Sequence, residues 1–165
     1  MICFLDRDGI INIDYGYVGT IERFEWCDGI FELLIKLKSI GYRFVLITNQ
    51  SGIDRGYFTY SDFLDLTFYM IDILNKSGID IEINYCRHHP KSNCKCRKPN
   101  PNMILRYDIS QQDIFIGDKD TDMIAAKAAG IKHRWIITDS PKGPFTNSFI
   151  NHYNLINFVN ENQID

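Results

Sequence analysis

The 165-residue chain lacks any long run of apolar residues and any strong excess of charge of one sign. A membrane-spanning helix needs about 20 consecutive apolar residues, and no stretch of this sequence approaches that length. The formal net charge is −3, which gives no reason to expect nucleic acid or an acidic membrane surface as a partner. Repeats and low-complexity tracts are also absent, so we expect a single domain over residues 1–165.

The sequence also lacks the marks of a secreted protein. Residues 1–6 contain neither a basic segment nor a cleavage site of the kind that ends a signal peptide. The five cysteines are an odd number, which argues against a disulfide framework. We therefore expect a cytoplasmic protein, and we expect it to be a monomer.

Segments with the patterns of strands and helices alternate along the chain. Strands are expected at residues 2–5, 43–47, 81–85, 114–116 and 134–137, and helices are expected to start near Asp28, Ser61 and Asp122, with a further one over 151–160. Strands separated by helices imply right-handed crossovers and a mostly parallel sheet that is covered on both faces. The sequence therefore predicts a three-layer α/β/α sandwich with a Rossmann-like, five-stranded sheet. No insertion is large enough to form a separate cap domain.

Residues whose side chains can take part in catalysis or bind a metal follow the ends of four expected strands. Asp6, Thr48, Cys86 and Asp118 each come at or just beyond such an end. In open parallel sheets, ligands bind outside the carboxyl ends of the strands. We therefore expect these groups, which are far apart in sequence, to meet at one edge of the sheet.

Acidic residues dominate two of these strand ends. Asp6 and Asp8 lie two residues apart, and Asp118 follows a glycine at the other end. Gathering three carboxylates produces strong repulsion, which a hard cation with oxygen ligands relieves, and magnesium is the obvious candidate. Asp120 and Asp122 lie in the same segment, but either can instead cap the helix that follows. The alternative for any single acid is a solvated turn residue.

This set of residues suits phosphoryl transfer through a covalent intermediate. Asp6 would act as the nucleophile, and Asp8 would protonate the leaving alcohol and later activate water. The Thr48 hydroxyl could donate a hydrogen bond to the transferring group, and Lys98 would balance its charge. The alternative for Lys98 and its neighbour Arg97 is an exposed polar loop.

A second cluster lies in residues 86–96. Cys86, Cys94 and Cys96, together with His88 or His89, supply the ligands of a closed tetrahedral zinc site. A closed site is structural, and it would stiffen a loop that is too short and polar to have its own core. Spacing alone does not choose between the two histidines. The alternative is a group of free thiols in a reducing compartment.

Taken together, these motifs resemble those of the haloacid dehalogenase superfamily of phosphotransferases. Its four motifs occur in order as Asp6-Arg-Asp-Gly9, Thr48-Asn49, Lys98 and Gly117-Asp118. The cysteine cluster resembles that of the zinc-bearing, minimal-cap branch, which contains heptose bisphosphate phosphatases and histidinol-phosphate phosphatases. Residues 6–18 and 48–58 resemble the first two loops of the heptose enzymes. The resemblance implies hydrolysis of the 7-phosphate of a heptose 1,7-bisphosphate through an aspartyl-phosphate, in the synthesis of nucleotide-activated heptose for products such as lipopolysaccharide.

The resemblance also implies a role for each matching residue. Magnesium would be held by Asp6, by the backbone carbonyl of Asp8 and by Asp118, while Thr48 and Lys98 steady the transferring phosphoryl group. Arg97 would recognise the far end of the substrate, its second phosphate. The sugar site would be lined by Asp14, Tyr15, Gly16, Tyr17, Asn49, Gln50 and Ser51, and Lys119 would also contact the substrate. The resemblance favours Cys86, His88, Cys94 and Cys96 as the zinc ligands.

Two other functions are compatible with the sequence. Only five residues separate His88 from Cys94, and such a short loop is common in the histidinol-phosphate branch. That substrate carries a cation, which Arg97 would repel but which Asp14 or Asp54 could accept. The second alternative is a zinc-stabilised binding module without catalysis, which the presence of every catalytic motif disfavours.

Overall fold

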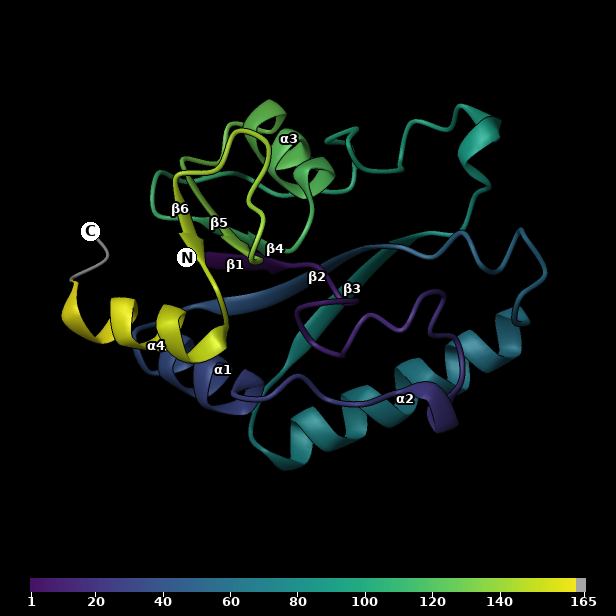
Figure 1. Cartoon of the computed structure of the whole chain (residues 1–165), viewed down its shortest axis with the longest axis horizontal. Helices are drawn as coiled ribbons and strands as arrows, with labels where there is room; N and C mark the ends of the chain where they lie inside the picture. Colours follow the sequence, from purple (N-terminus) through teal and green to yellow (C-terminus); the bar gives the residue numbers. More distant parts are fainter. Residues whose placement is uncertain (163–165) are drawn as a thin grey trace.

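The computed structural model describes residues 1–162 and shows a parallel sheet between two layers of helices (Figure 1). The expected domain runs to residue 165, so its last three residues lie outside the described part. Within the described part, every helix is too short or too polar to cross a membrane.

The sheet has six strands in the order β3-β2-β1-β4-β5-β6, and every neighbouring pair is parallel. The strands are β1 (Ile2–Leu5), β2 (Arg43–Asn49), β3 (Ile81–Cys86), β4 (Ile114–Gly117), β5 (His133–Ile137) and β6 (Asn147–Phe149). The predicted fold class is confirmed, but the prediction of five strands was wrong by one. The missed strand, β6, has only three residues and therefore shows no readable pattern.

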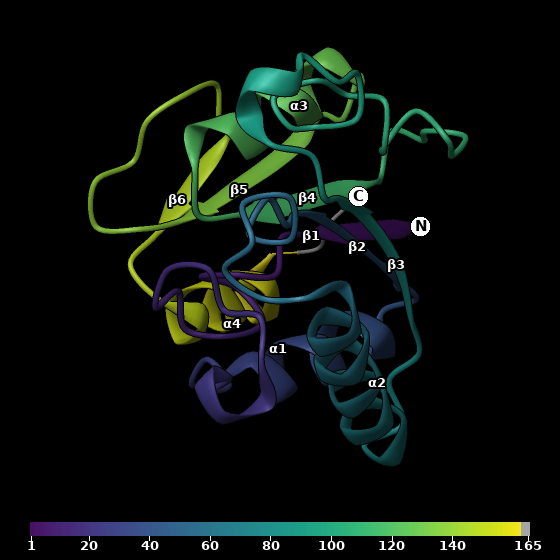
Figure 2. The same ribbon diagram turned by 90° about the vertical axis from the view of Figure 1, so that its right-hand side faces the viewer.

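Helices cover both faces of the sheet, as Figure 2 shows. The helices are α1 (Ile30–Ser39), α2 (Tyr60–Lys76), α3 (Asp120–Ala128) and α4 (His152–Glu161), with short 3-10 turns η1 (Ile21–Arg23) and η2 (Pro90–Ser92). Helices α1, α2 and α4 lie on one face, and α3 lies on the other. Successive side chains of β1 point to opposite faces of the sheet. Cys3 and Leu5 therefore belong to the core on the α1 side, whereas Ile2 and Phe4 belong to the core on the α3 side.

Two helix starts differ from the sequence prediction. Helix α2 was expected to be capped by Ser61, but the cap is Thr59, whose hydroxyl accepts a hydrogen bond from the Asp62 amide at 3.1 Å. The Asp62 carboxylate accepts one from the Thr59 amide at 2.7 Å, which completes a capping box. Helix α3 begins at Asp120, two residues before the expected start.

The order of the strands fixes where a ligand can bind. From β1 the chain moves outward through β2 to β3, and from β4 it moves the other way through β5 to β6. The reversal lies between the neighbouring strands β1 and β4, and such a switch point opens a crevice at the carboxyl ends of the strands. Asp6 follows β1 and Asp118 follows β4, so both lie at this crevice.

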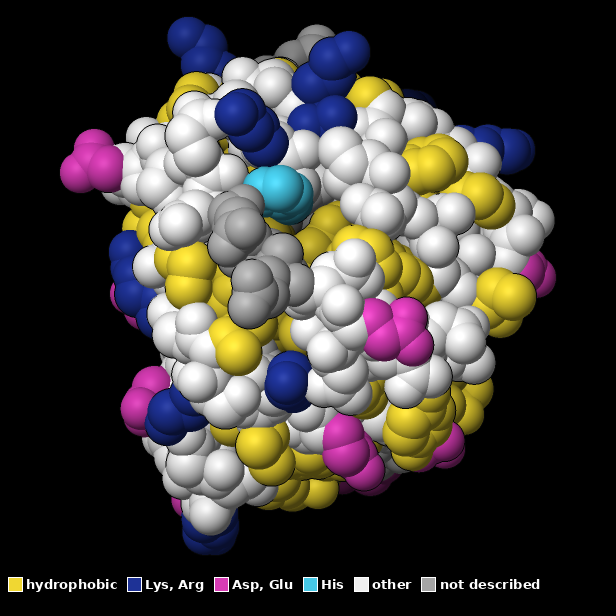
Figure 3. All heavy atoms as spheres, turned by 90° about the vertical axis from the view of Figure 1, so that its left-hand side faces the viewer, with side chains coloured by type: hydrophobic (Ala, Val, Ile, Leu, Met, Phe, Trp, Pro, Cys, Tyr) yellow, Lys and Arg dark blue, Asp and Glu magenta, His cyan; other side chains and the backbone are white. Residues whose placement is uncertain are grey.

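The opposite end of the sheet has a different surface. Figure 3 shows the face where β1 and β2 begin, with basic, acidic and apolar side chains interspersed over it. Charges of both signs are spread over this face. The buried charged residues Asp6, Lys98 and Asp122 instead lie at the carboxyl ends of the strands.

Candidate active site

A cavity of about 510 Å³ lies at the carboxyl ends of the central strands. Most residues expected from the sequence line it, namely Asp6, Asp8, Asp14, Gly16, Tyr17, Asn49, Gln50, Ser51, Arg97, Lys98 and Lys119. Four lining residues were not expected as site residues: Gly52, Pro99, Thr121 and Asp122. Three expected residues, Tyr15, Thr48 and Asp118, are not part of this lining.

Two carboxylates and one buried lysine line the base of the cavity, and the Asp118 carboxylate lies next to them, just outside the lining. One oxygen from each of Asp6, Asp118 and Asp122 lies within 4.8 Å of the others. The Lys98 ammonium is 2.8 Å from Asp6 Oδ1 and 2.6 Å from Asp122 Oδ1. Burial opposes the charge of Lys98, but Asp122 and Asp6 outweigh it and raise the pKa of this lysine, so it is a cation at neutral pH.

Asp118 is the carboxylate that this lysine does not satisfy. Its Oδ1 is buried and has no hydrogen-bond partner among the described residues, and its Oδ2 lies 3.5 Å from the Lys119 ammonium. Burial and the charges of Asp6 and Asp122 raise the pKa of Asp118 to about 8. An unpaired, buried carboxylate oxygen close to a second carboxylate is the setting that a divalent cation with oxygen ligands fits.

Gly9 explains how Asp118 can come so close to the loop after β1. A Cβ atom at this position would lie 2.4 Å from Asp118 Oδ2, and the residue has φ of +89°. Glycine is therefore required here for two reasons, space and backbone conformation.

Asp122 has a larger role than the sequence suggested. It was considered only as a solvated residue or a cap, and it does accept a hydrogen bond from the Lys119 amide at 3.1 Å. The side chain is also almost fully buried, and its other oxygen pairs with Lys98. Its position in the first turn of a helix directly after Asp118 is the signal that could have identified it.

Asp8 is held by donors from three directions. Arg7 Nη2 donates to both of its oxygens, at 2.8 and 3.1 Å, and Arg7 is itself buried. Asn12 donates to Oδ1 at 3.0 Å, and Gln50 donates to Oδ2 at 2.9 Å. The carboxylate therefore has a fixed orientation beside Asp6, which is what an acid/base group needs.

The carboxyl end of β2, where Thr48 and Asn49 lie, positions Lys98. The Asn49 amide group donates to the Lys98 carbonyl and accepts from the Lys98 amide, both at 3.1 Å. Gln50 donates to the Thr48 hydroxyl at 2.9 Å, and Thr48 is almost fully buried. The backbone of the lysine segment is thus tied to the neighbouring strand end.

The expected sugar residues occupy the rim of the cavity, with one exception. Asp14 pairs with the Lys119 ammonium at 2.7 Å, and this pair holds the pKa of Asp14 below its usual range despite partial burial. Tyr15 donates its hydroxyl hydrogen to Glu25 at 2.5 Å, outside the cavity lining. Its role as a sugar contact stays a prediction.

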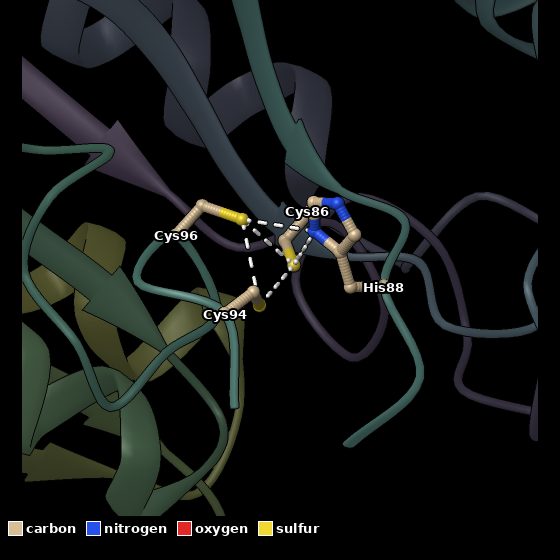
Figure 4. A group of neighbouring side chains, drawn as sticks. All are labelled: Cys86, His88, Cys94 and Cys96. Carbon is tan, nitrogen blue, oxygen red and sulfur yellow. Dashed lines mark hydrogen bonds between the residues drawn. The ribbon is translucent and has the colours of Figure 1, made fainter. Parts of the chain in front are cut away.

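The cysteine cluster forms a compact set of four ligand atoms (Figure 4). The Sγ atom of Cys86 lies 3.5 Å from both His88 Nδ1 and Cys94 Sγ and 3.2 Å from Cys96 Sγ. Cys96 Sγ lies 3.2 Å from His88 Nδ1 and 3.6 Å from Cys94 Sγ. Ligands arranged tetrahedrally around zinc stand roughly 3.5–3.8 Å from one another, so the set fits this ion.

Other features of the cluster agree with this assignment. His89 is directed elsewhere, since its Nδ1 accepts a hydrogen bond from the Lys91 amide at 3.1 Å and its own amide donates to Asp54. Although desolvation opposes it, hydrogen bonds from the Arg97 amide and the neighbouring thiols lower the pKa of Cys94 to about 7. A thiolate is the form that binds zinc.

Comparisons with known proteins agree with this geometry. The chain is 49% identical over 145 residues to D-glycero-beta-D-manno-heptose-1,7-bisphosphate 7-phosphatase of Helicobacter pylori, covering 84% of this chain and 83% of that protein. It is 43% identical over 168 residues to D-glycero-alpha-D-manno-heptose-1,7-bisphosphate 7-phosphatase of Campylobacter jejuni, covering 98% and 96%.

A solved structure has the same fold. D,D-heptose 1,7-bisphosphate phosphatase from B. bronchiseptica, in complex with magnesium and phosphate, superposes with a TM-score of 0.83 at 27% identity, covering 97% of this chain and 98% of that one. No family model matches the chain. The identity and coverage of the relatives, together with the four motifs at one sheet edge, show that the chain belongs to the heptose 1,7-bisphosphate 7-phosphatase family of the haloacid dehalogenase superfamily.

Proposed function

We propose that this protein hydrolyses the 7-phosphate of D-glycero-D-manno-heptose 1,7-bisphosphate, a step toward nucleotide-activated heptose. The names of the relatives support this substrate, and their two anomers, β and α, are both candidates. The observation that carries the proposal is the arrangement at the cavity floor, where Asp6 lies 2.8 Å from Lys98 and beside the fixed carboxylate of Asp8.

The reaction proceeds in two displacements. A carboxylate oxygen of Asp6 attacks phosphorus, the bond from phosphorus to the sugar oxygen breaks, and Asp8 gives its proton to that oxygen. Water then attacks the phosphorus of the aspartyl-phosphate, Asp8 takes the proton, and phosphate and free Asp6 are released. Lys98 balances the charge of the phosphoryl oxygens throughout, with the Thr48 hydroxyl as a second donor.

Magnesium would be held by Asp6, by Asp118 and by the backbone carbonyl of Asp8. When bound, it neutralises charge on the phosphoryl oxygens and relieves the repulsion between the two carboxylates. Asp122 is already neutralised by Lys98 at 2.6 Å, so we assign it to holding the lysine rather than the metal.

The rim supplies the groups for the second phosphate and the sugar. Arg97 lines the cavity directly before Lys98, and its planar guanidinium suits a phosphate. Asn49, Gln50 and Ser51 line the side formed by β2 and would contact the sugar. The zinc ligand Cys96 immediately precedes Arg97, so zinc would stabilise the segment that carries both cations.

Phosphate release with magnesium tests this function. The assay compares the α and β anomers of the heptose 1,7-bisphosphate with histidinol phosphate, using the Asp6→Asn variant as the blank. We expect the catalytic efficiency (kcat/KM) for one heptose anomer to exceed that for histidinol phosphate at least about 100-fold. A preference for histidinol phosphate would overturn the substrate assignment and leave the phosphatase mechanism intact.

Assembly and location are part of the same proposal. We infer a single domain over residues 1–165 that works in the cytoplasm as a monomer, without nucleic acid or membrane as a partner. The net charge of −3 supports the lack of attraction to polyanions. Light scattering should give a mass near 19.3 kDa, and a dimer mass would contradict the expected monomer.

A further inference from the structure

The loop of residues 14–17 forms one wall of the cavity in an unusual backbone conformation. Asp14, Gly16 and Tyr17 line the cavity. Gly16 and Tyr17 are consecutive residues with positive φ, +72° and +49°. A left-handed conformation is unfavourable for a tyrosine, so contacts outside the loop must hold it in this shape.

Arg23, at the end of η1, makes such contacts on the backbone side. Its Nη2 donates to the carbonyl oxygens of Tyr15 at 2.9 Å and Gly16 at 3.0 Å, and its Nη1 donates to that of Tyr17 at 3.4 Å. Three successive carbonyl oxygens therefore point toward one guanidinium. Without a cation there, the partial negative charges of these three oxygens would repel one another.

The ring of Tyr17 is held by the segment that follows β2. It packs edge-to-face on Tyr57, with ring centroids 4.5 Å apart, and the Arg55 guanidinium lies 5.4 Å from its centroid. The loop is thus fixed between Arg23 on its backbone and the segment after β2 on its side chain. Arg23 itself is outside the cavity lining.

We propose that Arg23 is a positioning residue for substrate binding, which acts by holding residues 14–17 in the shape of the cavity wall. The link to the substrate rests on the proposed function. Arg23 forms no hydrogen bond with the groups that perform the chemistry, so its loss weakens substrate binding and leaves the chemical step unchanged.

Kinetics and hydrogen exchange of an Arg23→Ala variant test this role. We expect KM for the heptose bisphosphate to rise about fivefold, kcat to stay within about twofold, and the amides of residues 15–18 to exchange at least about fivefold faster. Arg23→Lys should give a KM and exchange rates between those of the unmodified protein and Arg23→Ala, because a single ammonium cannot bridge three carbonyls as a guanidinium does. Unchanged exchange in this loop, or an unchanged KM, overturns the proposal.

Arg134 provides a matched control. It also donates to three backbone carbonyls, those of Pro144, Ile131 and Lys132, but it is outside the cavity lining. Arg134→Ala should leave KM and exchange in residues 15–18 unchanged, and an equal effect would overturn the specific role of Arg23. If the unmodified protein does not hydrolyse the bisphosphate, the proposed function fails, while the exchange rates still decide whether Arg23 holds the loop.

Discussion

The two clusters of metal-ligand side chains at this edge of the sheet differ in how completely their atoms are satisfied. In the cysteine cluster, the four ligand atoms lie within 4.8 Å of one another, and Cys86–Cys94 and His88–Cys96 are within hydrogen-bonding distance. In the carboxylate cluster, Lys98 pairs with Asp6 and Asp122, and one oxygen of Asp118 is left without a partner in residues 1–162. A closed set suits a structural ion, whereas an incomplete set leaves room for a cation and a substrate oxygen.

Among changes in the carboxylate cluster, removing the nucleophile should cause the largest loss of activity. We expect Asp6→Asn to lower kcat by at least about 10⁴-fold, because an amide cannot form the acyl-phosphate. The melting temperature should stay close to that of the unmodified protein, since removing one of several crowded buried acids relieves repulsion. Asp120→Asn, a change at an exposed acid nearby, is the control and should stay within about twofold; activity retained by Asp6→Asn would remove Asp6 as nucleophile.

Removing the charge of Asp122 should cause the next largest loss of activity. In Asp122→Asn the side-chain oxygen can still accept from the Lys119 amide, but the charge that pairs with Lys98 is lost. We expect kcat to fall about 100-fold and KM to change less, because Lys98 is less firmly placed at the phosphoryl group. A phosphate-release assay that finds full activity would show that Asp6 alone is sufficient to hold the lysine.

The cysteine cluster should affect stability more than chemistry. Cys94→Ser should lower zinc content from about one equivalent and reduce the melting temperature by about 10 °C, with a larger change in KM than in kcat. His89→Ala is the control, because His89 faces away from the cluster. Elemental analysis and thermal unfolding provide the readouts. Absence of zinc from a fully stable, active protein would contradict a structural ion.

The smallest effect is expected at Asn49. Its amide makes two hydrogen bonds to the backbone of Lys98, each at 3.1 Å. Asn49→Ala should lower kcat/KM about fivefold to tenfold, as expected for the loss of two such bonds. Asn75→Ala, on the exposed surface of α2, should have no effect, and equal losses in both variants would rule out a specific contribution of Asn49.

Much of the fold and site was predictable because the signals are local. The apolar segments of β1 and β2 and the helical spacing in α1 identify the layers, and the parallel crossover rule then brings Asp6 and Asp118 to one edge. The family resemblance favoured His88 over His89, and the geometry of the cluster agrees.

Other features depend on contacts that no local pattern reveals. Strand β6 is short and is defined by its pairing with β5. The pairing of Asp122 with Lys98 and the hydrogen bond from Gln50 to Asp8 join segments far apart in the sequence. The contacts of Arg23 are made to backbone carbonyls, which are the same in every sequence, so residue types gave no sign of them.

A crystal structure of the protein with magnesium and beryllofluoride, a phosphoryl mimic, would show directly whether Asp6 is the nucleophile beside a magnesium site. We expect beryllium bonded to a carboxylate oxygen of Asp6 and one magnesium ion about 2.0–2.1 Å from oxygens of both Asp6 and Asp118. Beryllium on another side chain, or a magnesium ion that does not touch Asp118, would contradict this expectation.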